Sequence, residues 1–255
     1  MIDRVLDRKP SPPDERDYKL ANYLKPVTLP VSTFWDRGHA VLDQKDTGHC
    51  VGFGWAQWGN TLPVNDNFLA IDAHNIYYEA KAIEGDPKGE DGAYGRDGAK
   101  AMKARGRLNA YAFGDINDAR QFLLTQGPVC FGLDWYEGMF TPDAQGVIRP
   151  TGKVKGGHWI VAYGCDANYV YFENSWGSDW GIDGTCKMEW RDVAYLMSQQ
   201  GEACAAVELP LPVVPPEPDT KSCLTSIFAL LDGFRGKSNK IKQAKQMLKD
   251  LLARI

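Results

Sequence analysis

Residues 156–188 read GGHWIVAYGCDANYVYFENSWGSDWGIDGTCKM. Two runs rich in β-branched and aromatic residues, 158–164 and 169–174, flank a short polar turn at 166–168. This pattern predicts an antiparallel β-hairpin.

The two ends of this hairpin carry side chains that suit acid–base chemistry. His158 opens the first strand and Asn174 closes the second, and a turn near residue 167 would bring them roughly opposite each other. The Asn174 oxygen can then accept the imidazole N–H and fix the tautomer of the ring. Small residues, Gly156 and Gly157, leave the ring accessible, and Trp176 is placed to shield the hydrogen bond from water.

Upstream, residues 43–53 read DQKDTGHCVGF and contain a candidate nucleophile, Cys50. A helical pattern begins at Cys50 and stops at Pro63, so the thiol lies at the positive end of the helix dipole, which favours the thiolate. Gly48 lets the backbone turn sharply into this helix. The Gln44 amide and the Cys50 backbone N–H are candidate oxyanion donors, and loss of one such donor typically costs about 3 kcal/mol of transition-state stabilisation.

Elsewhere the hydrophobic periodicity places helices before strands. The predicted helices after the first are 67–84, 97–105 and 118–126, and the further predicted strands are 129–135, 185–190 and 204–209. This order predicts an α+β architecture, with a helical lobe followed by an antiparallel sheet or barrel.

Three segments, DQKDTGHCVGF, GGHWIVAYG and NSWGSDWGIDGTCKM, resemble in this order the Cys, His and Asn boxes of the papain-like cysteine peptidases. The six-residue interval from Gln44 to Cys50 and the sixteen-residue interval from His158 to Asn174 are also similar to those of the family. The resemblance implies that Cys50 is the nucleophile, His158 the base and Asn174 the orienting amide. It also implies that Gln44 and the Cys50 N–H hold the oxyanion, with Gly48 and Trp176 in supporting roles.

Further segments extend the resemblance. Residues 14–20, 96–106 and 126–133 are similar to segments of the bacterial and phage branch of the family, so the match covers roughly 14–208. It implies a papain-like two-lobe fold with a helical lobe and an antiparallel β-barrel-like lobe. A helical tail at 219–255 follows this domain in the sequence.

The sequence also departs from the family pattern. Thr47 replaces a cysteine that is disulfide-bonded in plant and animal members, so that bridge is not expected here. His49 stands where a small residue is usual, and its effect on the thiol is left open. The interval from Cys50 to His158 is 108 residues, below the roughly 130–150 typical of plant and lysosomal enzymes. No segment resembles the long helical inhibitory propeptide of the family.

Composition and charge exclude several classes. The chain has 255 residues and a net charge of −4. The tail at 219–255 carries +5 and the preceding residues −9, and an acidic body argues against a nucleic-acid groove. No apolar run reaches the roughly 20 residues of a membrane span. The amino terminus lacks the apolar core of a secretory signal, so a cytoplasmic or virion-associated location is expected.

We expect four parts along the chain. The first is an extended arm at 1–32, and the second is the catalytic domain at 33–208, with its helical lobe at about 44–110 and its β lobe at about 111–208. A proline-rich linker, LPLPVVPPEP, covers 209–218. Two amphipathic segments form the tail at 219–255, which must dock either on the body or on a protein partner.

No metal or organic cofactor is expected. The six cysteines show no CxxC or CxxxxC spacing. Three histidines (His39, His49 and His74) and four carboxylates (Asp91, Asp97, Asp134 and Asp143) are interpreted as structural, loop or cap residues.

The sequence thus favours a cysteine endopeptidase that acts on a peptide or protein substrate through an acyl-enzyme. Two alternatives remain. One is a structural or peptide-binding component, such as part of a phage particle, with a weak or inactive site. The other is a peptidoglycan cross-bridge hydrolase or acyltransferase that uses the same triad.

Overall fold

The structure is a computed structural model that describes residues 4–207, 246, 248 and 249. The chain divides into two compact units, Met1–Leu209 and Pro210–Ile255. In the second unit the three described residues are helical. The predicted linker at 209–218 and nearly all of the predicted tail lie outside the described residues.

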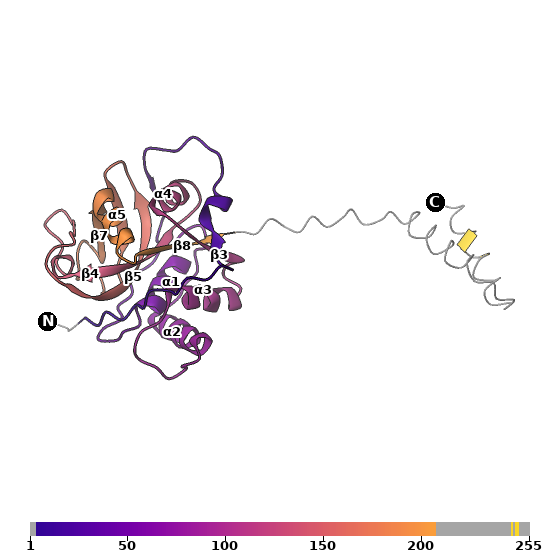
Figure 1. Ribbon diagram of the computed structural model, residues 1–255, viewed down its shortest axis with the longest axis horizontal. Coiled ribbons are helices and arrows are strands. Elements are labelled where there is room, and N and C mark those ends of the chain that lie inside the picture. The colour runs from indigo at the N-terminus through magenta and orange to yellow at the C-terminus, as the bar shows by residue number, and fades with distance from the viewer. Residues whose placement is uncertain (1–3, 208–245, 247, 250–255) are drawn as a thin grey trace. The chain divides into compact units, whose positions relative to one another are not determined.

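Three helices form one lobe of the first unit (Figure 1). Helix α1 spans Cys50–Asn60, α2 spans Ala70–Glu84 and α3 spans Gly95–Ala104. Every residue of α1 is buried, because α2 and α3 pack against it and strand β5 lies on its other side. Gly52 permits the closest approach, since a Cβ there would lie 2.2 Å from the carbonyl oxygen of Ala73 in α2.

The second lobe is built on an eight-stranded sheet. Its order is β1-β3-β8-β4-β5-β6-β7, with β2 paired to β5. The predicted arm at 1–32 contributes one short strand, β1 (Tyr18–Lys19), and β2 (Thr33–Phe34) follows directly after it. The other strands are β3 (Ala110–Gly114), β4 (Val129–Tyr136), β5 (Val154–Cys165), β6 (Tyr169–Glu173), β7 (Thr185–Glu189) and β8 (Glu202–Val207). Helices α4 (Ile116–Thr125) and α5 (Trp190–Ser198) and the short 3-10 helices η1 (Leu20–Tyr23) and η2 (Glu137–Met139) complete the lobe.

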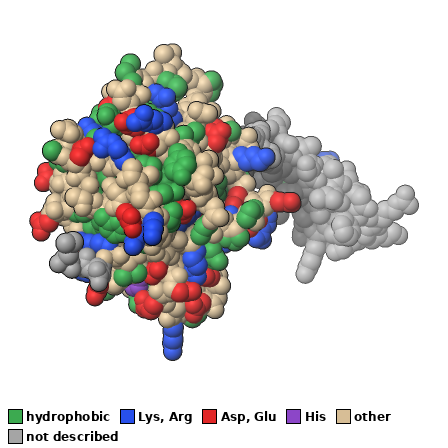
Figure 2. Space-filling model, turned by 60° about the vertical axis from the view of Figure 1, so that its left-hand side comes forward, with side chains coloured by type: hydrophobic (Ala, Val, Ile, Leu, Met, Phe, Trp, Pro, Cys, Tyr) green, Lys and Arg blue, Asp and Glu red, His purple; other side chains and the backbone are tan. Residues whose placement is uncertain are grey.

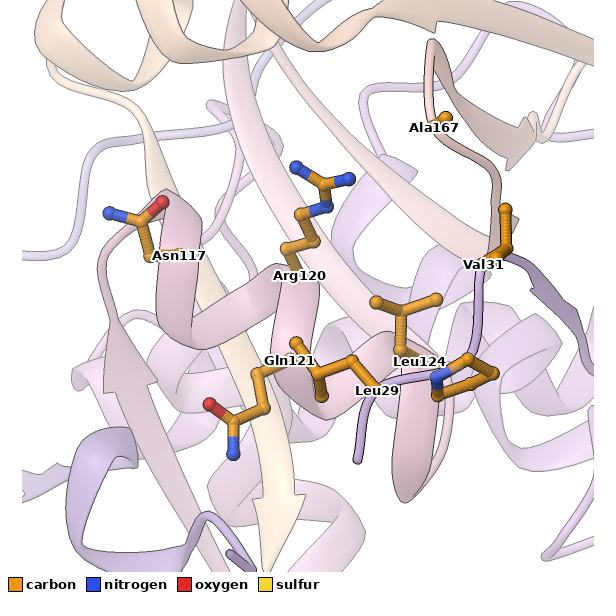
Figure 3. A pocket seen from close by; sticks show the side chains of 8 residues that line it. Leu29, Val31, Asn117, Arg120, Gln121, Leu124 and Ala167 are labelled. Carbon is orange, nitrogen blue, oxygen red and sulfur yellow. The ribbon is translucent and has the colours of Figure 1, made fainter. Parts of the chain in front are cut away.

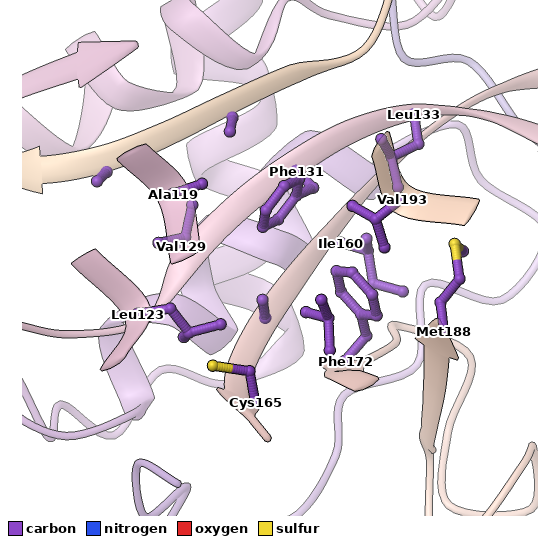
Figure 4. Close-up of a cluster of buried hydrophobic side chains, with 14 of the residues drawn as sticks. Ala119, Leu123, Val129, Phe131, Leu133, Ile160, Cys165, Phe172, Met188 and Val193 are labelled. Atoms are coloured by element: carbon purple, nitrogen blue, oxygen red, sulfur yellow. The ribbon is translucent and has the colours of Figure 1, made fainter. Parts of the chain in front are cut away.

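Alternate residues of β5 face two different cores. Trp159 and Val161 pack with α1, α2 and α3 in one buried cluster. Ile160 and Ala162 belong to the larger cluster of the β lobe, which α4 and α5 also line (Figure 4). The strand that carries His158 is thus fixed from both faces, which places the site where the two lobes meet.

The predicted α+β class and two-lobe papain-like fold are confirmed, and the predicted elements agree with the structure to within a few residues. Helix α1 begins at Cys50 as predicted, and α2, α3 and α4 begin two or three residues away from their predicted starts. The strand predicted at 185–190 ends at Glu189, because Trp190 begins α5, which the sequence analysis missed together with β3. The structure also shows no helix within residues 4–207 long and apolar enough to cross a bilayer.

The predicted hairpin is present, but its register differs from the expectation. The β5–β6 ladder ends at the pair Val161↔Glu173, with a bulge between Ala162 and Gly164. His158 lies three residues before that pair and Asn174 one residue after it, so they are not directly opposite. Their side chains meet diagonally instead.

Candidate active site

Cys50 is the first residue of α1 and is completely buried. Backbone N–H groups of Trp159 and Asp7 donate to its sulfur, so the thiol lies against the residue that follows His158. Burial raises the pKa of Cys50 to about 11, although both N–H groups oppose the shift. The favourable effect expected from the helix dipole on the thiolate is thus outweighed in this arrangement by desolvation of the charged sulfur.

The His158 ring is bonded to Asn174, with 2.7 Å between His158 Nε2 and Asn174 Oδ1. The same oxygen accepts the backbone N–H of Ser175 at 2.8 Å, which fixes the orientation of the amide. Nε2 must then carry the proton, since Oδ1 can only accept. The other ring nitrogen, Nδ1, is buried and has no hydrogen-bond partner, so its lone pair is available.

Indole rings enclose this pair. The ring centroids of Trp176 and Trp135 lie 5.1 and 4.8 Å from that of His158, and both tryptophans are buried. Burial lowers the pKa of His158 to about 4, although the hydrogen bond to Asn174 opposes this shift. The imidazole is therefore neutral at pH 7 in this structure, as is the thiol. Trp135 is a contact that the sequence analysis missed.

Gln44 lies beside the start of α1 and is buried. Its Nε2 donates to the carbonyl oxygen of Thr47 at 2.7 Å and approaches that of Val5 at 3.4 Å. Its Oε1 accepts the hydroxyl of Ser175 at 2.5 Å, which turns the amide so that Nε2 faces the chain near Cys50. Ser175 is a positioning residue whose role only the three-dimensional structure reveals.

Residues 4–9, the arm segment, run between the two lobes in an extended conformation (Figure 1). Asp7 forms a parallel bridge with Gly157 of β5, and Lys9 forms one with Tyr94. Arg4 fixes the start of the segment through hydrogen bonds of 2.8 Å to both Asp43 and the Trp176 carbonyl. The arm segment therefore covers the thiol.

Glycine makes room for the arm segment at two positions. A Cβ at Gly48 would lie 2.3 Å from Asp7 Oδ2, and one at Gly92 would lie 1.5 Å from the Asp7 carbonyl oxygen. Gly92 also has a left-handed φ of 82°, whereas Gly48 has no left-handed φ. Position 48 therefore requires glycine because a side chain there would collide with Asp7 of the arm segment, and not because the backbone makes a sharp turn.

His49 precedes the thiol and belongs to a separate polar cluster. Its Nδ1 lies 2.7 Å from His74 Nδ1 and its Nε2 lies 2.9 Å from Glu90 Oε2. Its ring stacks on Tyr77 with centroids 3.7 Å apart. Both nitrogens of His49 are thus occupied, and the ring ties the start of α1 to the loop that carries Glu90.

The other residues singled out in the sequence lie away from Cys50 or in simple ion pairs. His39 lies 3.8 Å from Glu173, Asp91 pairs with Lys81, Asp97 with Lys100, and Asp143 with Arg149. Asp134 lies inside β4 rather than in a loop. Five cysteines of the described chain are free and buried. Among the described residues, no three His, Cys, Asp or Glu side chains are grouped as a metal ion requires, and the absence of a cofactor stays a prediction.

Two surface features lie outside this site. A hollow lined by Leu29, Val31 and Arg120, among others, has no cysteine, histidine or carboxylate in its wall (Figure 3). Charged side chains of both signs are interspersed over the described surface that Figure 2 shows. Neither feature offers a set of groups for covalent chemistry.

Comparison with known proteins gives the family. A family model described as papain family cysteine protease matches residues 65–205, which is more than half of the chain. The chain belongs to the papain family. The matched stretch contains His158 and Asn174 and begins after Cys50, so the assignment of the nucleophile depends on the geometry around α1.

Papain-family relatives and structures agree with this assignment. Cathepsin L of Sarcophaga peregrina is 26% identical over 210 residues, covering 66% of this chain and 62% of that protein. A cathepsin B-like cysteine proteinase 6 of Caenorhabditis elegans is 33% identical over 84 residues, covering 30% of this chain and 22% of that protein. The chain thus spans less than two thirds of these relatives.

Solved structures share the fold. Xylellain, a cysteine protease from Xylella fastidiosa, superimposes with a TM-score of 0.64 at 20% identity, over 80% of this chain and 96% of that one. Digestive procathepsin L 3 of Tenebrio molitor gives a TM-score of 0.52 at 16% identity, over 75% and 76% of the two chains.

Proposed function

We propose that this protein is a cysteine endopeptidase that cleaves peptide or protein substrates through Cys50, His158 and Asn174. The observation that carries the proposal is the state of the His158 ring. Its Nε2 is bonded to Asn174, its Nδ1 has no partner, and the next residue in the strand donates its backbone N–H to the Cys50 sulfur. Nucleophilic catalysis requires a base with a free nitrogen close to the nucleophile, and Trp159, which follows His158 in the chain, contacts the thiol.

In the proposed reaction, His158 Nδ1 takes the thiol proton and the Cys50 sulfur attacks the scissile carbonyl carbon. Gln44 Nε2 and the Cys50 backbone N–H donate to the oxyanion that forms. The imidazolium then protonates the leaving amine as the C–N bond breaks, which leaves a thioester. Water, deprotonated by His158, hydrolyses this thioester and restores the thiol.

The substrate and the arm segment compete for the same place. Asp7 N–H bonds the Cys50 sulfur, and the Val5 carbonyl lies 3.4 Å from Gln44 Nε2. Burial also keeps both proposed catalytic groups neutral, with Cys50 in contact with Asp7 of this segment and His158 enclosed by Trp135 and Trp176. Turnover therefore requires the arm segment to leave, after which water lowers the desolvation cost of the thiolate–imidazolium pair.

The proposal also includes the branch of the family, the location of the protein and a partner for its C-terminal tail. Membership in the bacterial and phage branch rests on the resemblance of residues 14–20, 96–106 and 126–133, together with the likeness to a bacterial structure. A cytoplasmic or virion-associated location and a protein partner for 219–255 rest on the sequence alone.

The test uses the full chain and its Arg8→Ala variant, in which the arm segment loses its buried side chain. Each is incubated with casein and, separately, with purified cell wall. We expect casein hydrolysis that Cys50→Ala abolishes and that a matched change of another buried cysteine, Cys204→Ala, retains. Unchanged hydrolysis in Cys50→Ala would refute the proposal, and release of fragments from cell wall alone would favour the peptidoglycan alternative.

A further inference from the structure

The Arg8 side chain of the arm segment fills a buried pocket next to the proposed catalytic groups. Its exposed fraction is 0%, and that of its partner Glu202 is 11%. Arg8 Nε and Nη2 lie 3.1 and 3.0 Å from the same oxygen, Glu202 Oε1. Nη2 also donates to the Gln200 carbonyl at 3.0 Å. A long cationic side chain is thus held along its Nε–Nη2 edge by a carboxylate that is nearly closed off from water.

The walls of this pocket come from three neighbouring strands. Gly132 of β4 pairs with Trp159 of β5 on one side and with Glu202 of β8 on the other. A Cβ at Gly132 would lie 2.5 Å from Arg8 Nε and 2.9 Å from the Trp159 ring. The space for the guanidinium therefore exists because this position has no side chain. We call the space bounded by Gly132, Trp159 and Glu202 the Glu202 pocket.

The Glu202 pocket lies close to the thiol, because the residue that fills it, Arg8, directly follows the residue that contacts the sulfur, Asp7. Asp7 N–H donates to the Cys50 sulfur, and the next residue, Arg8, donates its own N–H to the Gly157 carbonyl at 2.9 Å. Lys9 N–H donates to the Ala93 carbonyl at 3.0 Å. An extended peptide that bonds to these carbonyls must pass the mouth of the pocket and direct a side chain toward it.

Departure of the arm segment leaves Glu202 without its cation. With Arg8 in place Glu202 is 11% exposed, and a new cationic side chain that enters the pocket restores the ion pair that is lost when the segment leaves. Asp134 of β4 adds a second negative charge that interacts with Arg8 from the same strand as Gly132. An apolar or acidic side chain would leave both carboxylates unpaired.

We propose that the Glu202 pocket selects an arginine or lysine side chain of the substrate close to the scissile bond, and that Glu202 is the specificity-determining residue. This proposal rests on the proposed peptidase function. According to this proposal, Arg8 of the arm segment occupies the place of the substrate's basic side chain, which enters the pocket after the segment has left.

A positional scan of peptides first identifies the substrate position at which the side chain affects cleavage most. The experiment then compares fluorogenic peptides that carry arginine, citrulline or leucine at that position. Citrulline keeps the shape of arginine without its charge. The enzyme is the full chain with Arg8→Ala, alone and combined with Glu202→Gln. Glu137→Gln, at an exposed carboxylate elsewhere in the β lobe, is the matched control. We expect kcat/KM for arginine about 100-fold above that for citrulline, a ratio near one in Glu202→Gln, and an unchanged ratio in Glu137→Gln.

Two results would overturn the proposal while leaving the peptidase function intact. One is Cys50-dependent cleavage with no preference for arginine, and the other is a preference that survives Glu202→Gln. If no peptide is cleaved, the peptidase function fails instead. Binding of labelled peptides to Cys50→Ala/Arg8→Ala, measured by fluorescence anisotropy, then decides about the pocket. Tighter binding of the arginine peptide that depends on Glu202 supports it, and equal binding of all three peptides refutes it.

Discussion

His49 and His158 both belong to the surroundings of Cys50, but their hydrogen bonds differ. His49 precedes Cys50 in the chain and uses both ring nitrogens, on His74 and Glu90. His158 is brought to the thiol by β5, uses one nitrogen on Asn174 and leaves the other free. A base needs a free lone pair. Only His158 has one, although His49 is the nearer residue in sequence.

The partners of the two rings also differ in charge. Glu90 is a carboxylate with an exposed fraction of 62%, and the hydrogen bond from His49 lowers the pKa of Glu90. Asn174 is neutral and completely buried. A neutral amide orients the His158 ring but, unlike a carboxylate, does not strongly stabilise the imidazolium ion. The ring can therefore pass between its neutral and cationic forms during a reaction. The comparison supports the proposal that His158 is the catalytic base, whereas His49 links the start of α1 to Glu90.

The largest effect is expected for His158→Gln. Loss of the partner-free His158 nitrogen, the proposed base, should lower kcat/KM for a peptide substrate by about 10⁴-fold. The measurement is steady-state hydrolysis in the Arg8→Ala background, with the unfolding temperature as a control for folding. Near-normal activity in a folded His158→Gln protein would show that another group is the base.

Asn174→Ala should have the next largest effect. The variant leaves the His158 Nε2–H buried without an acceptor and the ring free to turn, at a cost of about 1–3 kcal/mol. This corresponds to a decrease in kcat of about 5- to 150-fold with a smaller change in KM. A change confined to KM would contradict an orienting role for the amide.

The pH dependence of thiol alkylation should distinguish the covered from the uncovered site. With the arm segment in place, burial raises the pKa of Cys50 to about 11 and lowers that of His158 to about 4. The thiol of the intact chain should then react slowly at pH 6–7 and faster as the pH rises. In Arg8→Ala, water reaches the pair, the pKa of Cys50 falls, and alkylation at pH 6–7 should accelerate at least ten-fold.

This experiment measures the iodoacetamide rate at Cys50 by mass spectrometry, with buried Cys130 as the internal reference. Burial raises the pKa of Cys130 well above its usual value, and this cysteine lies inside β4. Equal rates for Cys50 in the intact chain and in Arg8→Ala would contradict the inference that the segment controls the thiol.

The smallest catalytic effect is expected for His49→Gln. Glutamine can replace one of the two hydrogen bonds, so kcat/KM should change less than about three-fold, while the free energy of unfolding falls by about 1 kcal/mol. Hydrolysis and chemical denaturation measure the two quantities separately. A large loss of kcat with unchanged stability would mean that His49 takes part in the reaction.

Sequence reasoning found the elements whose patterns are local. The helix that begins at Cys50 and the hairpin after His158 follow from periodicity and from Pro63 and the polar turn at 166–168. The register differs from the expectation because the β5–β6 pairs nearest His158 centre on residue 167, whereas 158 and 174 average 166, and a bulge between Ala162 and Gly164 changes the pairing again toward the turn. A bulge depends on packing around the strand, which a single sequence does not record.

The arm segment lay beyond sequence reasoning for a different reason. Its contacts join residues far apart in the chain, such as Arg8 with Glu202. The same limit applies to the pKa of Cys50, because the helix dipole is readable from sequence and burial under another segment is not.

The most direct test of the central claim is to locate the adduct of a peptidyl epoxide on the full chain carrying Arg8→Ala. The electrophile needs a peptide-binding path, an activated thiol and an acid in one place. We expect mass spectrometry to find one adduct, on Cys50, that disappears in His158→Gln. Labelling spread over the other cysteines, or labelling of Cys50 that is unchanged in His158→Gln, would contradict the account.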